Sequence, residues 1–248
     1  MCLAGCAAGV PAGSVEGRYV EVHSDLGETE AQTLALEADS FVERVCAYLQ
    51  ARPPGARVYV FRNVRGLRAF LRRECPAFAA RVGACFEGRD GGLVVAVLAK
   101  DGGRPSVAKL RHELTHAVVA ANFRDAMPWL DEGLAQVFES GCPPAEDRTR
   151  IRALRKNAVD GERLERLFAV TERAELSEKD YLVAWGMTWC LVREGERGRR
   201  TVLECLAPAR AGENAVERVR RCTGGSLEQR AQNVNALIAR DGRPSDVK

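Results

Sequence analysis

The chain has 248 residues, 46% of them hydrophobic, so it is long enough and apolar enough to bury a sizeable core. Its 37 basic and 34 acidic residues nearly balance, at a formal net charge of +3. No basic patch or stripe marks a nucleic-acid binder, and no stretch is apolar enough to span a bilayer. These features predict a globular protein without a nucleic-acid partner.

The segment 1–17 is rich in Ala and Gly, which predicts a disordered tail or the remnant of a lipoprotein signal. Residues 3–6 (LAGC) resemble a bacterial lipobox, in which the cysteine, here Cys6, is lipidated. Only two residues precede this motif, whereas a signal peptide needs a charged region and an apolar region. Two locations stay open: the bacterial cell envelope or the exterior if Cys6 carries a lipid anchor, and the cytoplasm otherwise.

Strand signals gather in the first hundred residues. Alternating polarity, β-forming residues and a turn at 90–92 predict strands, and apolar residues at helical spacing predict helices. In chain order the expected elements are a strand at 18–23, a helix at 28–50, a strand at 57–61, a helix from Asn63 to about Cys75 and a hairpin at 84–99.

Helical patterns dominate the rest of the chain, beginning with a helix that Ser106 is placed to cap. Helices are expected further on at 147–157, 162–170, 178–194, 198–207, 212–222 and 226–240. Because strands come first and helices later, we expect an α+β fold with a small N-terminal mixed sheet and a helical C-terminal half.

The nine cysteines are odd in number and include no C-x-x-C pair. This argues against a cysteine-based zinc site and against a dense disulfide framework. One or two disulfides are compatible with the count, and the sequence does not pair them. The default interpretation is that most of the cysteines are small core residues.

A potential metal-binding motif occupies residues 112–116 (HELTH). Residues four apart share a helix face, so His112 and His116 can bind one ion. Glu113 is rotated round the helix, beside the ion but not a ligand. Leu110, Leu114, Ala117, Val118 and Ala121 form a core stripe on the opposite face.

A second helix is expected from Pro128, which suits the first turn, to about Gly141. Its Glu132 can turn back toward the histidines, and Gly133 lets two backbones approach closely. A ligating imidazole is usually oriented by a hydrogen bond between its other ring nitrogen and a neighbouring polar group. The sequence offers Asp131, Gln136 and Glu139 for this role and does not choose among them.

Two histidines and one glutamate, with a fourth position open to water, make up the ligand set of a catalytic zinc site. The alternative is that the motif arose by chance in helical sequence and that its histidines are ordinary core residues. Only three histidines occur in the chain and two belong to the motif. This favours a site for one Zn²⁺.

Residues 112–116 together with residues 128–135 (PWLDEGLA) resemble the gluzincin metallopeptidases. Within that group the motif pattern is most similar to that of the small bacterial peptidase-MA-like domains. The resemblance is specific over about 93–140 and looser over 18–206. It implies a zincin-like catalytic domain at 18–206, with a metal-binding helix pair, followed by a C-terminal helical extension at 207–248.

The same resemblance implies roles for individual residues. His112, His116 and Glu132 would be zinc ligands, and Glu113 would activate a zinc-bound water to hydrolyse a bond of a peptide or protein substrate. Tyr181 would be the oxyanion donor, the alternative being a core aromatic whose hydroxyl is paired. The aminopeptidase exopeptidase motif is absent from the sequence, so an endopeptidase is slightly favoured.

The strand at 93–98 would be a sheet edge that pairs with extended substrate by analogy with related enzymes, and a buried core strand is the alternative. Two rival functions also stay open. One is a zinc-binding scaffold of the same fold that no longer cleaves, and the other is a helical interaction protein with an accidental motif. Retention of Glu113 argues against the scaffold, because zinc binding alone does not need it.

Overall fold

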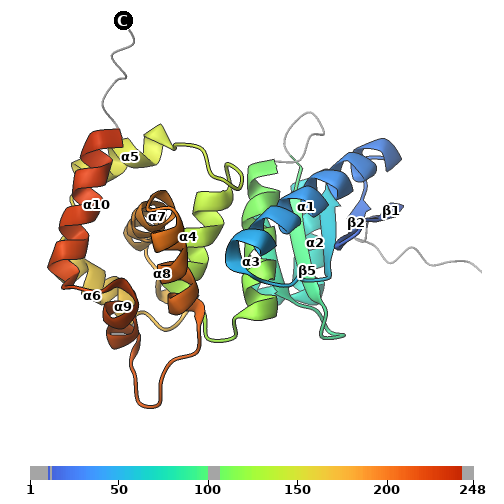
Figure 1. Ribbon diagram of the computed structural model, residues 1–248. Helices are drawn as coiled ribbons and strands as arrows, with labels where there is room; N and C mark the ends of the chain where they lie inside the picture. The colour runs from blue at the N-terminus through green and yellow to red at the C-terminus, as the bar shows by residue number, and fades with distance from the viewer. Residues whose placement is uncertain (1–10, 12, 100–106, 242–248) are drawn as a thin grey trace, which may run out of the picture. The chain divides into compact units, whose positions relative to one another are not determined.

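The computed structural model describes residues 11, 13–99 and 107–241 (Figure 1). The chain divides into two units, one formed by residues 1–122 and 138–143 and the other by residues 123–137 and 144–248. The strands of the described residues all lie in the first unit, and the second unit is helical. The predicted α+β class is therefore confirmed. No described helix combines the length and apolarity needed to cross a bilayer.

A five-stranded mixed sheet, in the order β1-β2-β3-β5-β4, organises the first unit. The strands are β1 (Gly13–Glu16), β2 (Val20–Ser24), β3 (Ala56–Phe61), β4 (Gly83–Glu87) and β5 (Leu93–Leu98). The three inner strands run parallel, and each edge strand is antiparallel to its neighbour. The predicted hairpin at 84–99 is thus β4 and β5, joined by a turn in which Gly91 has φ of +80°.

Two expectations about this sheet are wrong. Residues 13–16 form β1 where a disordered tail was expected, because pairing with β2 orders them. The strand at 93–98 is not an edge, because β5 pairs with β3 on one side and β4 on the other. The alternative, a buried core strand, is correct, and the edge belongs to β4. Cys6 lies outside the described residues.

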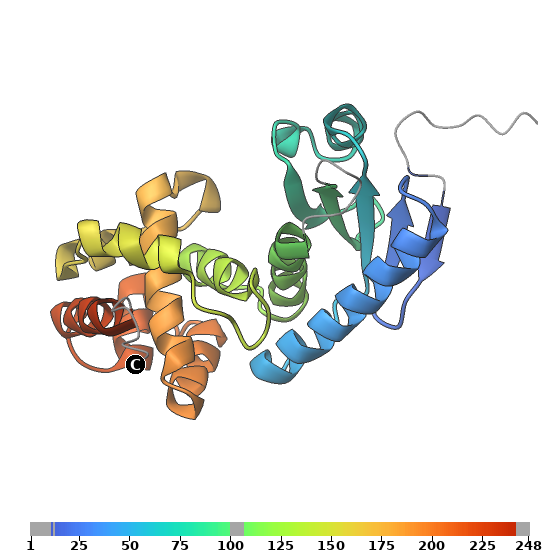
Figure 2. The same cartoon turned by 90° about the horizontal axis from the view of Figure 1, so that it is seen from above.

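Helices cover both faces of the sheet (Figure 2). On one face α1 (Glu28–Leu49) and α3 (Val107–Asn122) pack on each other and on the strands. On the other face lie α2 (Val64–Glu74) and the short helix η1 (Pro76–Phe78). Successive side chains of β3 point to opposite faces of the sheet, so both faces carry apolar groups that a helix can cover. Tyr59 and Phe61 point to the α2 face, where their ring centroids lie 4.6 and 5.2 Å from that of Phe70.

The second unit is a cluster of helices around α7. Its elements are α4 (Pro128–Phe138), α5 (Arg148–Lys156), α6 (Gly161–Ala169), η2 (Arg173–Glu175), α7 (Glu178–Arg193), α8 (Glu196–Leu206), α9 (Ala215–Thr223) and α10 (Leu227–Asp241). Residues 183–191 of α7 are all buried, which explains its central position. Helices α9 and α10 pack on α5, α6, α7 and α8, so the expected extension at 207–248 is part of this unit.

Polar side chains cap the helices, and the starts of α2 and α7 agree with the expected ones, whereas α9 begins at Ala215 and not at residue 212. Asn63 accepts a hydrogen bond from the Gly66 amide, as predicted. Ser177 and Asp180 form a reciprocal capping box at α7, and Asn214 does so with Glu217 at α9. Ser106, the expected cap of α3, lies outside the described residues.

Gly133 permits the close approach that its sequence position suggested, between α4 and α7. A Cβ atom on Gly133 would lie 2.7 Å from the Ala184 carbonyl oxygen and closer still to Thr188 Oγ1. A backbone oxygen cannot rotate away, so only glycine fits at this crossing.

We expect Gly133→Ala to destabilise the protein by about 2 kcal/mol or more, because overpacking forces the two helices apart. The midpoint of thermal unfolding, followed by circular dichroism, measures the effect. Gly92→Ala is the control, since the nearest atom to its Cβ is the mobile end of Arg57 at 3.4 Å. Equal midpoints for the two variants would contradict the assigned role of Gly133.

Candidate metal centre

Helix α3 brings two imidazoles together, as their spacing predicted. The Nε2 atoms of His112 and His116 lie 3.1 Å apart, and the rings meet edge-on at 83°. Both residues are buried, with 7% and 3% of their surface exposed. The predicted core stripe is buried at four of its five positions, whereas Ala121 is exposed.

Glu139, just beyond α4, orients the first imidazole. Its Oε1 lies 2.8 Å from His112 Nδ1. An ionised carboxylate only accepts, so the Nδ1–H of His112 donates to Glu139, and Nε2 is the ring nitrogen that faces His116. The structure thus selects Glu139 from the three orienting groups that the sequence offered. This contact fixes the orientation and the tautomer of the His112 ring, as carboxylates that accept a hydrogen bond from a ligating imidazole do in metal sites.

Glu139→Ala should therefore weaken zinc binding roughly 10- to 100-fold, because the His112 ring loses its orienting partner. Competition with a chromophoric chelator measures the affinity. Glu146→Ala removes a nearby carboxylate that is exposed to solvent, and it should leave the affinity unchanged. If both variants bind zinc as tightly as the parent protein, the Glu139 contact does not serve a metal site.

Glu132 lies in the first part of α4 and has only 4% of its surface exposed. The Nε atom of Arg173 lies 3.9 Å from Glu132 Oε2, and the same guanidinium binds the carboxylate of Asp131. Arg173 belongs to η2, remote in sequence, and no pattern in the sequence marked it. The Arg173 guanidinium offsets the free-energy cost of burying the carboxylates of Asp131 and Glu132, because buried charges need partners.

His112, His116 and Glu132 form a buried group that could hold a metal ion: one potential ligand atom from each lies within 4.8 Å of the others. Two imidazoles and a carboxylate are the protein ligands of one class of catalytic zinc site. Zn–N bonds of about 2.05 Å at a tetrahedral angle would separate the two nitrogens by roughly 3.4 Å, close to the observed 3.1 Å. The residues therefore fit zinc.

Glu113 is next to this group in sequence and lies outside it. It is 3% exposed, and its Oε1 lies 2.8 Å from the Lys109 ammonium, one helical turn earlier. The same oxygen would be 2.8 Å from a Cβ atom on Gly83 of β4. The carboxylate therefore lies against the edge strand, in contact with a cation that the sequence analysis did not identify.

Tyr181 is half-buried near the start of α7, one turn before Ala184. The carbonyl oxygen of Ala184 packs against Gly133, and Gly133 follows Glu132 in the sequence. No described hydrogen bond or ion pair joins Tyr181 to Glu132. Its role as an oxyanion donor stays a prediction.

No protein-family model matches the chain, and no curated protein matches its sequence.

Proposed function

We propose that the protein is a zinc-dependent peptidase of gluzincin type, with His112, His116 and Glu132 as zinc ligands. The observation that carries this proposal is the buried group of two imidazoles and one carboxylate. A further buried carboxylate, Glu113, follows the first ligand on the same helix.

The chain's own residues divide the chemistry between them. Zinc held by this donor set would supply a Lewis acid and lower the pKa of water. Glu113 would accept the proton of the attacking water and pass it to the leaving amine. Lys109, at 2.8 Å, would hold the Glu113 carboxylate in one orientation during both transfers.

A tetrahedral oxyanion also needs a donor from the protein. Tyr181 is the candidate that the resemblance suggests. Arg173 is a second candidate, because its guanidinium lies 3.9 Å from the carboxylate of Glu132. An extended substrate would pair with the edge strand β4, beside Glu113, rather than with the inner strand β5.

A zinc-binding scaffold without peptidase activity is the second candidate function. The Lys109–Glu113 ion pair favours it, because the ammonium already occupies one oxygen of the carboxylate that would act as base. The Glu113 side chain itself favours the enzyme, since a purely structural zinc site has no use for a buried carboxylate beside its ligands.

Incubation with a peptide library, with cleavage detected by mass spectrometry, distinguishes the peptidase from the scaffold. The peptidase predicts zinc-dependent cleavage that a chelator abolishes and zinc restores. Internal cuts would assign an endopeptidase, and removal of terminal residues an exopeptidase. Stoichiometric zinc without cleavage of any peptide would instead support the scaffold.

A further inference from the structure

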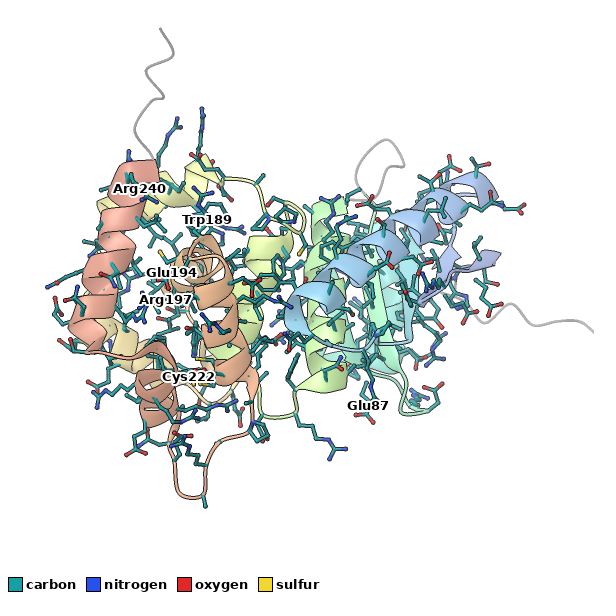
Figure 3. The ribbon with its side chains drawn as sticks, in the orientation of Figure 1. Glu87, Trp189, Glu194, Arg197, Cys222 and Arg240 are labelled. Atoms are coloured by element: carbon teal, nitrogen blue, oxygen red, sulfur yellow. The ribbon has the colours of Figure 1, made fainter. Side chains whose placement is uncertain are left out.

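A pocket of the first unit lies between α2 and the turn that joins β4 to β5. Its volume is about 340 Å³, at the lower end of the range for sites that enclose small molecules. Tyr59 and Val94 line it from the sheet, Phe70 from α2 and Gly88 from the turn. Figure 3 marks the place of this turn through Glu87, the last residue of β4. None of the three candidate zinc ligands is among the residues that line this pocket.

One wall of the pocket is apolar. Phe70 and Val94 are buried, and the ring centroid of Tyr59 lies 4.6 Å from that of Phe70. The Arg73 guanidinium lies over the Phe70 ring, 5.6 Å from its centroid. The pocket therefore places a cation next to a surface that can bury the hydrocarbon part of a ligand.

Charged side chains form the rest of the lining. Of the residues that the structure describes, three cations and two carboxylates line the pocket: Arg57, Arg73, Arg89, Glu74 and Asp90. One positive charge is thus in excess, and this excess favours an anionic ligand.

Two of the arginines keep hydrogen-bond donors for a ligand. Arg57 Nη2 donates to Asp90 Oδ1 at 2.6 Å, and Arg73 Nε donates to Glu74 Oε1 at 2.6 Å. A guanidinium carries five N–H donors, and within the described part of the chain neither side chain makes another hydrogen bond. Their side chains are 31% and 35% exposed, so a ligand can reach the remaining donors.

The turn fixes the position of the Arg57 guanidinium. Asp90 Oδ1, which accepts from Arg57, also accepts from the Gly92 amide at 3.2 Å. Cβ atoms on Gly88 and Gly92 would lie 3.1 and 3.4 Å from Arg57 Nη2, so the backbone of the turn packs closely on the cation. A guanidinium held in this way loses little conformational entropy when it binds a planar anion.

We propose that this pocket binds a ligand in which a carboxylate is attached to an apolar group, as at the carboxyl end of an apolar amino acid. The remaining donors of Arg57 and Arg73 would bind the carboxylate, and the apolar wall would bury the hydrocarbon group. A monoanion matches the single excess charge, whereas Glu74 and Asp90 would repel a phosphate dianion more strongly. A free small acid and the C-terminus of a peptide share this chemistry.

Isothermal titration calorimetry of the full-length protein tests the proposal, with N-acetyl-phenylalanine as the probe. We expect saturable binding. N-acetyl-phenylalanine amide, which lacks the carboxylate, and inorganic phosphate, which lacks the apolar group, should each bind at least roughly 10-fold more weakly. A tripeptide that ends in phenylalanine with a free carboxyl group distinguishes the sources. Tighter binding of the tripeptide would assign a peptide C-terminus, and equal or weaker binding would assign a free small acid.

Substitutions locate the binding. Arg57→Gln and Arg73→Gln should each weaken it roughly 10-fold or more, because each removes charge-assisted hydrogen bonds and keeps a polar side chain. Arg72→Gln is the matched control, since Arg72 precedes Arg73 on α2, is exposed and does not line the pocket. It should bind the probe like the parent protein, and so should His116→Ala, because the metal centre does not contribute to this pocket.

The proposal is overturned if N-acetyl-phenylalanine does not bind, or if the amide or phosphate binds as tightly. It is also overturned if Arg72→Gln or His116→Ala weakens binding as much as the two pocket variants do. The comparison of the acid with its amide on the parent protein decides the matter even if a pocket variant fails to fold. Neither zinc nor peptide cleavage enters the readout, so the result is independent of the proposed function.

Discussion

Glu113→Gln should lower peptide hydrolysis by about 10³-fold while the protein still binds one zinc ion per chain. The amide has nearly the shape of the carboxylate and can still accept a hydrogen bond from Lys109, so the fold and the metal ligands stay in place. It cannot accept a proton from water. The loss therefore falls on kcat, with KM nearly unchanged.

Steady-state kinetics on a peptide identified from the library, with zinc measured by elemental analysis, provide both readouts. Glu74→Gln is the matched control, because Glu74 is another carboxylate paired with a cation, Arg73, in the same unit. It should retain full activity. A fully active Glu113→Gln variant would place the base elsewhere, and one that loses zinc would assign Glu113 a structural role.

His116→Ala should release the metal. Removing one of the three proposed ligands should cost more than removing an orienting partner, so we expect the zinc affinity to fall by more than about 100-fold. The rise in unfolding midpoint that zinc gives the parent protein should disappear with it, because a ligand stabilises the folded state only when it binds that state.

His23, the third histidine of the chain, provides the control for removal of an imidazole. His23 lies on β2, where its ring stacks on Tyr59 at 4.5 Å. His23→Ala should keep one zinc per chain and the zinc-dependent rise in midpoint. If His116→Ala binds zinc with parental affinity, or if His23→Ala loses it, the assigned ligand set is wrong.

Local chemistry made much of this structure predictable. Capping residues such as Asn63 and Ser177 determine where helices begin, because they satisfy amides that lack an intrahelical partner. Helical geometry alone places His112 and His116 on one face. Gly133 was expected to permit a close approach, although its packing partner, α7, was not foreseen.

Features that depend on distant segments were not predictable. Strand order is one, because nothing local to residues 93–98 reveals that β3 pairs along the edge that the predicted hairpin leaves open. The side chains beside the ligands are another: Lys109 and Arg173 gain their roles only from tertiary packing. Glu139 was one of three orienting candidates until its distance to His112 was known.

X-ray absorption at the zinc edge of the purified full-length protein tests the ligand set most directly. The account predicts one zinc per chain in a shell of nitrogen and oxygen at about 2.0–2.1 Å, with imidazole scattering that falls in His116→Ala. The chain carries nine cysteines, so sulfur is the realistic rival ligand. A sulfur shell near 2.3 Å, or a spectrum unchanged by loss of His116 and Glu132, would contradict it.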